Sequence, residues 1–247
     1  MKTILITGAT AGIGTALAHT FVKAGHRVII TGRRIERLAD LQAELAPNCH
    51  ALCFDLQDKD AVEAAIAQLP IDWKDIDILI NNAGLALGRS PIQTGKLSDW
   101  DIMIDTNLKG LLYLSRQIMP LMIARKQGHI INLGSIAGKQ VYPGGNIYCA
   151  TKHAVRAISQ AMRLDLLPHR IKVTDVQPGM VETEFSVVRF KGDQQAADKV
   201  YQGFQPLIAQ DIADIVYYLS DLPPHVNINE IEITCLAQAN AYQTIKS

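Results

Sequence analysis

Short apolar runs alternate along the chain with longer segments in which apolar residues recur at helical spacing. The short runs are rich in Ile, Val and Leu, which is typical of strands buried on both faces of a parallel sheet. We expect seven strands, at Thr3–Thr7, Arg27–Thr31, His50–Phe54, Ile76–Ile80, His129–Leu133, Lys172–Val176 and Glu230–Thr234. We expect helices at Gly14–Ala24, Ile35–Leu45, Asp58–Gln68, Leu97–Lys126 (as one helix or two), Tyr148–Leu167 and Asp211–Ser220.

This alternation predicts the fold class. Parallel strands that follow one another through helices need crossover connections, which place helices on both faces of the sheet. We therefore expect α/β architecture: a doubly wound (Rossmann) parallel sheet of about seven strands. The chain has 247 residues and no linker rich in Pro or Gly, so residues 1–247 are expected to form a single domain.

Composition limits the partners that this domain is expected to have. Lys plus Arg and Asp plus Glu each number 24, whereas proteins that bind nucleic acid or anionic membranes are usually basic. No apolar run reaches the roughly 18 residues of a membrane span, and the apolar N-terminal stretch is too short for a signal peptide. The four Cys residues have neither CxxC nor metal-ligand spacing. We expect a cytoplasmic protein without a nucleic acid, membrane or metal partner.

A glycine-rich turn, Thr7-Gly8-Ala9-Thr10-Ala11-Gly12-Ile13-Gly14, joins the first predicted strand to the first predicted helix. Glycines allow a tight turn and a close approach to a pyrophosphate, and N–H groups at the helix start then face the phosphates. The spacing is G-x-x-x-G-x-G rather than G-x-G-x-x-G, and structural punctuation is the alternative. We predict that Gly8, Ala9, Thr10, Ala11, Gly12, Ile13 and Gly14 hold a dinucleotide.

The tip of the second predicted strand indicates which dinucleotide. An acidic residue there would bind the ribose 2′-hydroxyl of NAD and repel the 2′-phosphate of NADP. The strand instead ends in Thr31-Gly32-Arg33-Arg34, which offers two guanidinium groups to a phosphate. A solvated basic helix start is the alternative, but arginine opposes the helix dipole at that position. The sequence therefore favours NADP.

Four further residues suggest proton transfer. Tyr148 and Lys152 are four apart in a predicted helix and share a face, where an ammonium would lower the pKa of the phenol; a surface pair is the alternative. Ser135 follows a strand, where such sheets bind ligands, so it could hold a substrate oxygen or cap a turn. Asn107 is unfavourable within a helix, and we expect it to interrupt one so that its carbonyl group holds a water for the lysine.

Together these residues resemble the short-chain dehydrogenase/reductase family over nearly the whole chain. Thr7–Gly14 is similar to the family's TGxxxGIG turn, Asn81–Gly84 to its NNAG motif and Pro178–Thr183 to its PG motif. Its catalytic tetrad is matched in order and spacing by Asn107, Ser135, Tyr148 and Lys152.

The resemblance implies a role for each residue. Tyr148 would be the general acid/base, and Lys152 would lower the pKa of Tyr148 and bind the nicotinamide ribose. Ser135 would position the substrate oxygen, and Asn107 would anchor a proton-relay water. The remaining contacts to NADP would come from Asp55, Leu56, Asn82, Gly84, Pro178, Val181 and Thr183. The cofactor would supply the hydride chemistry, and the protein would supply the positioning of the reactants and the electrostatics.

Segments 82–88, 144–148, 184–193 and 225–229 further resemble the bacterial NADP-dependent 3-hydroxy acid dehydrogenases, a typically tetrameric subgroup. This implies a homotetramer and a small substrate such as serine, allo-threonine or 3-hydroxypropionate. The expected substrate loop, at about residues 180–205, carries Arg189 and Lys191, either of which could bind a carboxylate or simply be solvated. A reductase of another carbonyl, such as a 3-oxoacyl thioester or a xenobiotic ketone, is the alternative. A non-catalytic dinucleotide sensor would not need the complete tetrad.

Overall fold

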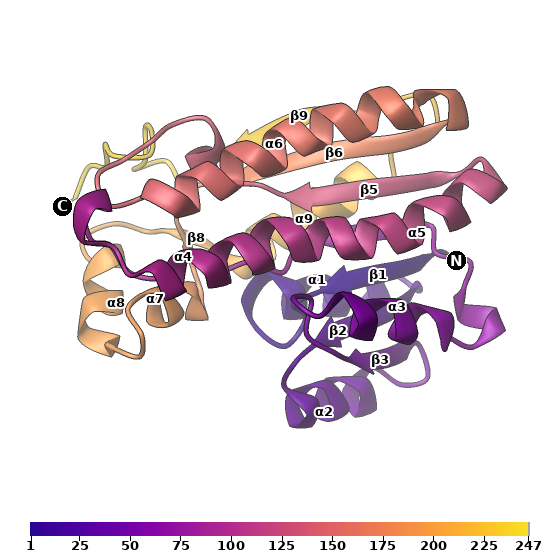
Figure 1. Ribbon diagram of the computed structural model, residues 1–247. Coiled ribbons are helices and arrows are strands. Elements are labelled where there is room, and N and C mark those ends of the chain that lie inside the picture. The colour runs from indigo at the N-terminus through magenta and orange to yellow at the C-terminus, as the bar shows by residue number, and fades with distance from the viewer. Residues whose placement is uncertain (247) are drawn as a thin grey trace.

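The computed structural model describes residues 1–246, with a seven-stranded parallel sheet at its centre (Figure 1). Its strand order is β3-β2-β1-β4-β5-β6-β9. The strands are β1 (Thr3–Thr7), β2 (Arg27–Gly32), β3 (Cys49–Cys53), β4 (Ile78–Asn81), β5 (Gly128–Leu133), β6 (Ile171–Pro178) and β9 (Glu230–Ile233). The order reverses between β1 and β4, and the crevice at the carboxyl ends of strands at such a point is where doubly wound sheets bind ligands.

The predicted fold class is confirmed. All seven predicted strands are present, with ends that differ from the expected ones by no more than two residues. β1 agrees at both ends, whereas β6 continues to Pro178. Ser247, the last residue of the expected domain, lies outside the described residues.

Two apolar cores lie on opposite faces of the sheet, and β1 contributes to both. Ile4 and Ile6 face one core, whereas Leu5 faces the other, because successive strand residues point to opposite faces. Helices α1 (Gly12–Lys23), α2 (Ile35–Leu45) and α9 (Ala209–Ser220) cover the first, and α3 (Lys59–Ala67), α5 (Leu111–Arg125) and α6 (Asn146–Leu166) cover the second. This burial fixes the strand ends that carry the site.

The predicted helix at Leu97–Lys126 is divided in two. A π-helical segment at Asp105–Gly110 separates α4 (Leu97–Ile104) from α5. Asn107 lies within this segment, so the expectation that it interrupts the helix is confirmed. Such π segments are frequent at functional sites.

The residues between β6 and α9 form more structure than the predicted loop. Strands β7 (Val181–Glu182) and β8 (Leu207–Ile208) pair with each other, and helices α7 (Glu184–Arg189) and α8 (Gln194–Tyr201) lie between them. We call residues 181–208 the lid. Figure 1 shows α7 and α8 at the carboxyl end of the sheet, on the same side as the C-terminus.

Smaller elements complete the fold. Short 3₁₀ turns occur at Ile71–Trp73, Ile92–Thr94, Ile136–Gly138 and Leu167–His169. The segment after β9 folds back so that Gln238 and Thr244 form an isolated bridge. Within residues 1–246, no helix is both long and apolar enough to span a bilayer.

Candidate active site

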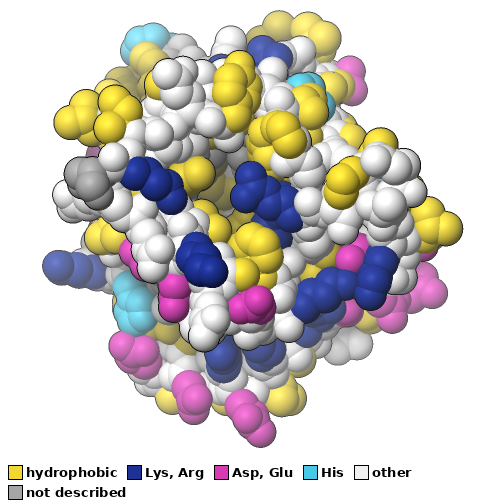
Figure 2. Space-filling model, turned by 90° about the vertical axis from the view of Figure 1, so that its left-hand side faces the viewer, with side chains coloured by type: hydrophobic (Ala, Val, Ile, Leu, Met, Phe, Trp, Pro, Cys, Tyr) yellow, Lys and Arg dark blue, Asp and Glu magenta, His cyan; other side chains and the backbone are white. Residues whose placement is uncertain are grey.

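A cavity of about 480 Å³ lies at the carboxyl ends of the strands, between the sheet and the lid. Figure 2 shows this end as a hollow with apolar side chains inside and several Lys and Arg side chains around it. Its size suits a small-molecule site. It brings together most of the predicted site residues: Gly8, Thr10, Ala11, Gly12, Ile13, Arg33, Arg34, Asp55, Leu56, Asn82, Gly84, Ser135, Tyr148, Lys152, Pro178, Val181, Thr183 and Arg189.

Three predicted residues, Ala9, Gly14 and Asn107, are not part of this lining. Ala9 is fully buried, its N–H donates to the Thr31 carbonyl, and its carbonyl accepts from Thr15 Oγ1. Both of its backbone groups are therefore already used. Its role is to hold the turn against β2, and the structure does not support it as a cofactor contact.

The glycine turn provides a place where a backbone can approach a phosphate. Gly8 and Gly12 have φ values of +65° and +52°, and a Cβ on Gly14 would lie 2.3 Å from the Gly8 carbonyl oxygen. Helix α1 follows with Ala11 at its N-cap, no capping side chain and no acidic residue in its first turn. Its first N–H groups therefore lack a side-chain acceptor, which fits a phosphate ligand.

The two arginines at the tip of β2 lie beside this turn. Arg34 donates from Nε and Nη2 to Thr10 Oγ1, at 3.0 and 2.8 Å. Arg33 Nη1 lies 3.1 Å from Asp55 Oδ2 and keeps 59% of its side chain exposed. Both guanidinium groups are thus held at the rim of the cavity with further N–H groups free to bind an anion, as 2′-phosphate recognition requires.

A third arginine and an acid join this cluster, and the sequence analysis missed both. Arg37 Nη1 donates to Glu184 Oε1 at 2.8 Å, and Arg34 Nη1 donates to Glu184 Oε2 at 3.0 Å. Burial acts to raise the pKa of Glu184, but the two arginines outweigh it and hold that pKa below its ordinary value. Arg37 could have been found from its spacing, because residues three apart share a helix face.

Tyr148, Lys152 and Ser135 lie together on the sheet side of the cavity, and all three are buried. Lys152 Nζ donates to the Leu133 carbonyl at 2.7 Å and lies 5.9 Å from the centroid of the Tyr148 ring. Burial lowers the pKa of Lys152 to about 8, against the opposing effect of the Asp175 charge. Lys152 is therefore close to the point at which it loses its proton near neutral pH.

The pKa of Tyr148 differs from the sequence-based expectation. Burial raises it above its ordinary value, and the nearby Tyr142 adds to that effect, whereas hydrogen bonding to Ser135 and the charge of Arg189 lower it. The ammonium of Lys152 was expected to lower this pKa, but desolvation of the phenolate dominates. The proton of Tyr148 is thus held firmly at neutral pH.

Ser135 and Asn107 have structural contacts beyond their predicted roles. Ser135 Oγ accepts from the Ala137 N–H at 3.1 Å, so it also caps a turn, the alternative that the sequence left open. Asn107 Oδ1 accepts from the Leu85 N–H, and Asn107 Nδ2 donates to the Leu85 carbonyl, both at 2.8 Å. The side chain of Asn107 therefore holds the backbone of Leu85 in place.

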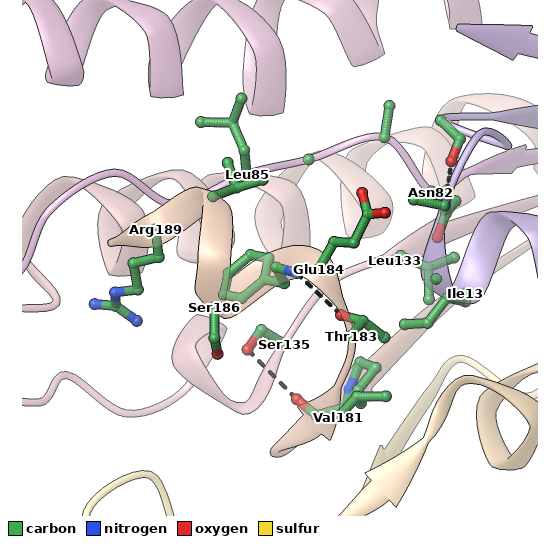
Figure 3. Close-up of a pocket in the computed structure, with 18 of the residues that line it drawn as sticks. Ile13, Asn82, Leu85, Leu133, Ser135, Val181, Thr183, Glu184, Ser186 and Arg189 are labelled. Atoms are coloured by element: carbon green, nitrogen blue, oxygen red, sulfur yellow. Dashed lines mark hydrogen bonds between the residues drawn. The ribbon is translucent and has the colours of Figure 1, made fainter. Parts of the chain in front are cut away.

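Arg189 extends from the C-terminal end of α7 at the other side of the cavity (Figure 3). Its Nη1 donates to Tyr142 Oη at 2.9 Å, and its guanidinium carbon lies 5.8 Å from the centroid of the Tyr148 ring. Among the described residues it has no carboxylate partner, whereas Lys191 pairs with Asp99 at 2.7 Å. Of the two lid cations that the sequence offered, only Arg189 faces the cavity unneutralised.

A buried carboxylate, Asp175 in β6, lies near Lys152, and the sequence-based prediction did not include it. It is fully buried, and a Cβ on Gly134 would lie 2.2 Å from its Oδ1. Gln177 Nε2 donates to its Oδ2 at 2.6 Å, whereas Oδ1 has no partner among the described residues. Its charge acts on Lys152. The signal was present in the sequence, as an Asp inside a strand that was predicted to be buried.

Comparison with known proteins gives the family and its near relatives. Residues 2–194 match the family described as short chain dehydrogenase. The chain is 48% identical, over 96% of each sequence, to the NADP-dependent 3-hydroxy acid dehydrogenase YdfG of Escherichia coli. It is also 48% identical to serine 3-dehydrogenase of Agrobacterium fabrum, over 97% of this chain and 96% of the relative. A solved structure of serine dehydrogenase, in its closed form with NADP+, superposes with a TM-score of 0.96 at 47% identity over 99% of both chains.

Proposed function

Because the chain belongs to the short-chain dehydrogenase family, we propose that it is an NADP-dependent oxidoreductase acting on a small 3-hydroxy acid. It interconverts this acid with the corresponding 3-oxo acid or semialdehyde. The observation that carries the proposal is Arg189, an unneutralised guanidinium 5.8 Å from the ring of Tyr148 in one cavity. A carboxylate on Arg189 would place a nearby hydroxyl within reach of the phenol. The names of the relatives support the same substrate class and the same cofactor.

The residues present fit NADP. The uncapped start of α1 and the glycine turn suit the pyrophosphate, and Arg33 and Arg34 suit the 2′-phosphate. Asp55, Leu56, Asn82, Gly84, Pro178, Val181 and Thr183 are proposed to line the rest of the cofactor site, with the nicotinamide end toward Lys152. When bound, the cofactor accepts or donates the hydride.

The protein's own residues are proposed to move the proton. In oxidation, the phenolate of Tyr148 accepts the proton of the substrate hydroxyl, and Ser135 Oγ holds the same oxygen. Burial disfavours that phenolate, and the ammonium of Lys152, 5.9 Å from the ring centroid, would favour it as a nearby positive charge. A water held on the main-chain carbonyl of Asn107 would pass the proton on toward solvent. Asn107 and Lys152 both lie beside Gly84, since a Cβ there would be 3.3 Å from Asn107 Oδ1 and 3.4 Å from Lys152 Nζ.

We also propose a single domain, a homotetramer and a cytoplasmic location. The four cysteines are free thiols, in keeping with a reducing compartment. Helices α5 and α6 expose Leu112 and Leu164, at 39% and 74%, on faces that a second copy could cover. The proposed domain is continuous because the lid packs on the same sheet that carries the catalytic group.

A substrate panel tests the proposed function. The purified protein is assayed for NADPH formation with serine, allo-threonine, 3-hydroxypropionate, 3-hydroxybutyrate and an uncharged secondary alcohol, and each is repeated with NAD+. We expect the highest kcat/KM with a 3-hydroxy acid and NADP+. A higher value with the uncharged alcohol, or reduction of a 3-oxoacyl thioester in preference to the acids, would replace this proposal with a reductase of another carbonyl. Tight NADPH binding with no turnover of any substrate would indicate a dinucleotide sensor.

A further inference from the structure

We propose that Glu184 is a latch that couples the 2′-phosphate site to closure of the lid over the substrate. The inference rests on the proposed function for the identity of the two ligands. Glu184 begins α7, and its carboxylate reaches across the cavity opening to Arg34 and Arg37 at 3.0 and 2.8 Å. These arginines belong to the tip of β2 and the first turn of α2, not to the lid. The ion pairs therefore join the lid to the adenosine end of the cofactor site.

The same short helix carries the proposed substrate anchor at its other end. Arg189 is five residues after Glu184, about 7.5 Å along the helix axis. Figure 3 shows the Glu184 carboxylate and the Arg189 guanidinium extending from α7 in different directions. A movement that released Glu184 would therefore also displace Arg189. One rigid helix thus touches the cofactor site and the substrate site.

The lid has the internal bracing that such coupling needs. Tyr201 of α8 hydrogen-bonds Ser186 of α7 at 2.7 Å and donates to the Val181 carbonyl at 2.9 Å. Thr183 caps α7 through the Phe185 N–H and lies against the glycine turn, since a Cβ on Gly12 would be 3.1 Å from it. A displacement of Glu184 is therefore expected to move the whole lid, because these hydrogen bonds join α7 to α8 and to the start of the lid.

A phosphate and Glu184 can be held by the arginines at the same time. Arg37 contacts Glu184 and the Thr10 carbonyl through Nη1 alone, which leaves its Nε and Nη2 without a described partner. Arg34 directs Nε and Nη2 to Thr10 and Nη1 to Glu184, and a guanidinium has five N–H groups. A 2′-phosphate would order both side chains where the latch needs them. Binding there should therefore favour the closed lid.

Glu184→Gln tests the latch, with Glu182→Gln as the matched control. Both acids lie at the start of the lid and are exposed, so neither change disturbs a core, but no described ion pair involves Glu182. Limited trypsin cleavage at Arg189, Lys191 and Lys199 reports lid opening without any turnover. We expect Glu184→Gln to be cleaved about three- to tenfold faster than wild type, the scale of a half-exposed charge network, and Glu182→Gln to match wild type. The KM for 3-hydroxypropionate should rise by a similar factor, with kcat within about twofold.

Adenosine 2′,5′-bisphosphate tests the coupling, because it carries the 2′-phosphate but no nicotinamide. It should slow cleavage of the wild-type lid and protect Glu184→Gln less, whereas adenosine 5′-phosphate should protect neither. Arg37→Gln should reproduce the Glu184→Gln phenotype, and the double variant should add little to either. Equal cleavage of Glu184→Gln and wild type, or faster wild-type cleavage with the bisphosphate, would overturn the latch. Failure to oxidise any 3-hydroxy acid would overturn the proposed function instead, and leave the cleavage results standing.

Discussion

The two walls of the cavity are built in different ways. The sheet wall carries Ser135, Tyr148 and Lys152, which are 8%, 8% and 6% exposed, and Tyr148 packs in an apolar cluster with Ala137 and Cys149. The lid wall carries Glu184 and Arg189, which are held by ion pairs and hydrogen bonds at the protein surface. Displacing a buried group requires a free energy close to that of unfolding the whole domain. Segments with few apolar contacts can open locally at a lower free energy. The sheet wall is therefore suited to the chemistry, and the lid wall to admitting and selecting the substrate.

Tyr148→Phe should produce the largest effect, because it removes the proton-transfer group of the sheet wall. We expect kcat to fall about 10²–10⁴-fold, the usual contribution of general acid–base catalysis. The dissociation constant of NADPH, measured by fluorescence titration, should stay within about twofold. Tyr218→Phe, on the exposed face of α9, is the control. A variant that kept more than a tenth of wild-type kcat would place the chemistry elsewhere.

Replacing Arg33 and Arg34 by Ala tests the adenosine end, where the two walls meet. The double variant should raise the dissociation constant of NADPH about 10–100-fold, since charged hydrogen bonds contribute roughly 1.5–3 kcal/mol when fully formed and less when exposed. The dissociation constant of NADH, which lacks the 2′-phosphate, should change little. An equal rise in the dissociation constants of NADPH and NADH would show that these side chains support the site without binding the 2′-phosphate.

Arg189→Ala tests the selecting role of the lid. We expect the KM for 3-hydroxypropionate to rise about tenfold, with a smaller change in kcat, because the anchor binds the ground state and the transition state alike. Arg189→Lys should recover part of the loss, since it restores the charge without the fork-shaped contact. Lys191→Ala, which removes a lid cation paired with Asp99, should leave KM unchanged. Unchanged kinetics in Arg189→Ala would remove Arg189 from substrate binding.

Asp175→Asn should give the smallest effect, a shift in pH dependence within the sheet wall. Burial lowers the pKa of Lys152 to about 8, so its ammonium prevails below that pH and is lost above it. The Asp175 charge opposes this lowering, so neutralising it should lower the pKa of Lys152 further. The alkaline decline of kcat/KM should then begin at a lower pH than in wild type. Asp165→Asn, exposed on α6, should leave the profile in place, and a shift toward higher pH would contradict this electrostatic role.

The same contrast separates what the sequence could predict from what it could not. Strands such as β1 are buried on both faces, so their apolar runs are unambiguous, and the sheet wall follows from the residues at the strand ends. The helical spacing of Tyr148 and Lys152 likewise placed both on one face of α6. Local sequence rules decide these positions.

The structure of the lid could not be predicted from such local rules. Helices α7 and α8 are six and eight residues long, too short for a clear amphipathic period. Glu184 is 150 residues from Arg34 in the sequence, and no local pattern announces that pair. The rise in the pKa of Tyr148 was not predicted for a related reason. It results from desolvation of the phenol, which depends on the complete fold. Tertiary contacts, not propensity, determine these features.

Transfer of a labelled hydride tests the proposed reaction most directly. The protein is incubated with NADP+ and 3-hydroxypropionate deuterated at C3, and the isolated NADPH is analysed by mass spectrometry. We expect NADPH that carries one deuterium and, at equal concentration, much slower labelling from 1-propanol deuterated at C1, which has no carboxylate for Arg189. Absence of deuterium in NADPH, or equal labelling from both alcohols, would contradict hydride transfer from a small 3-hydroxy acid.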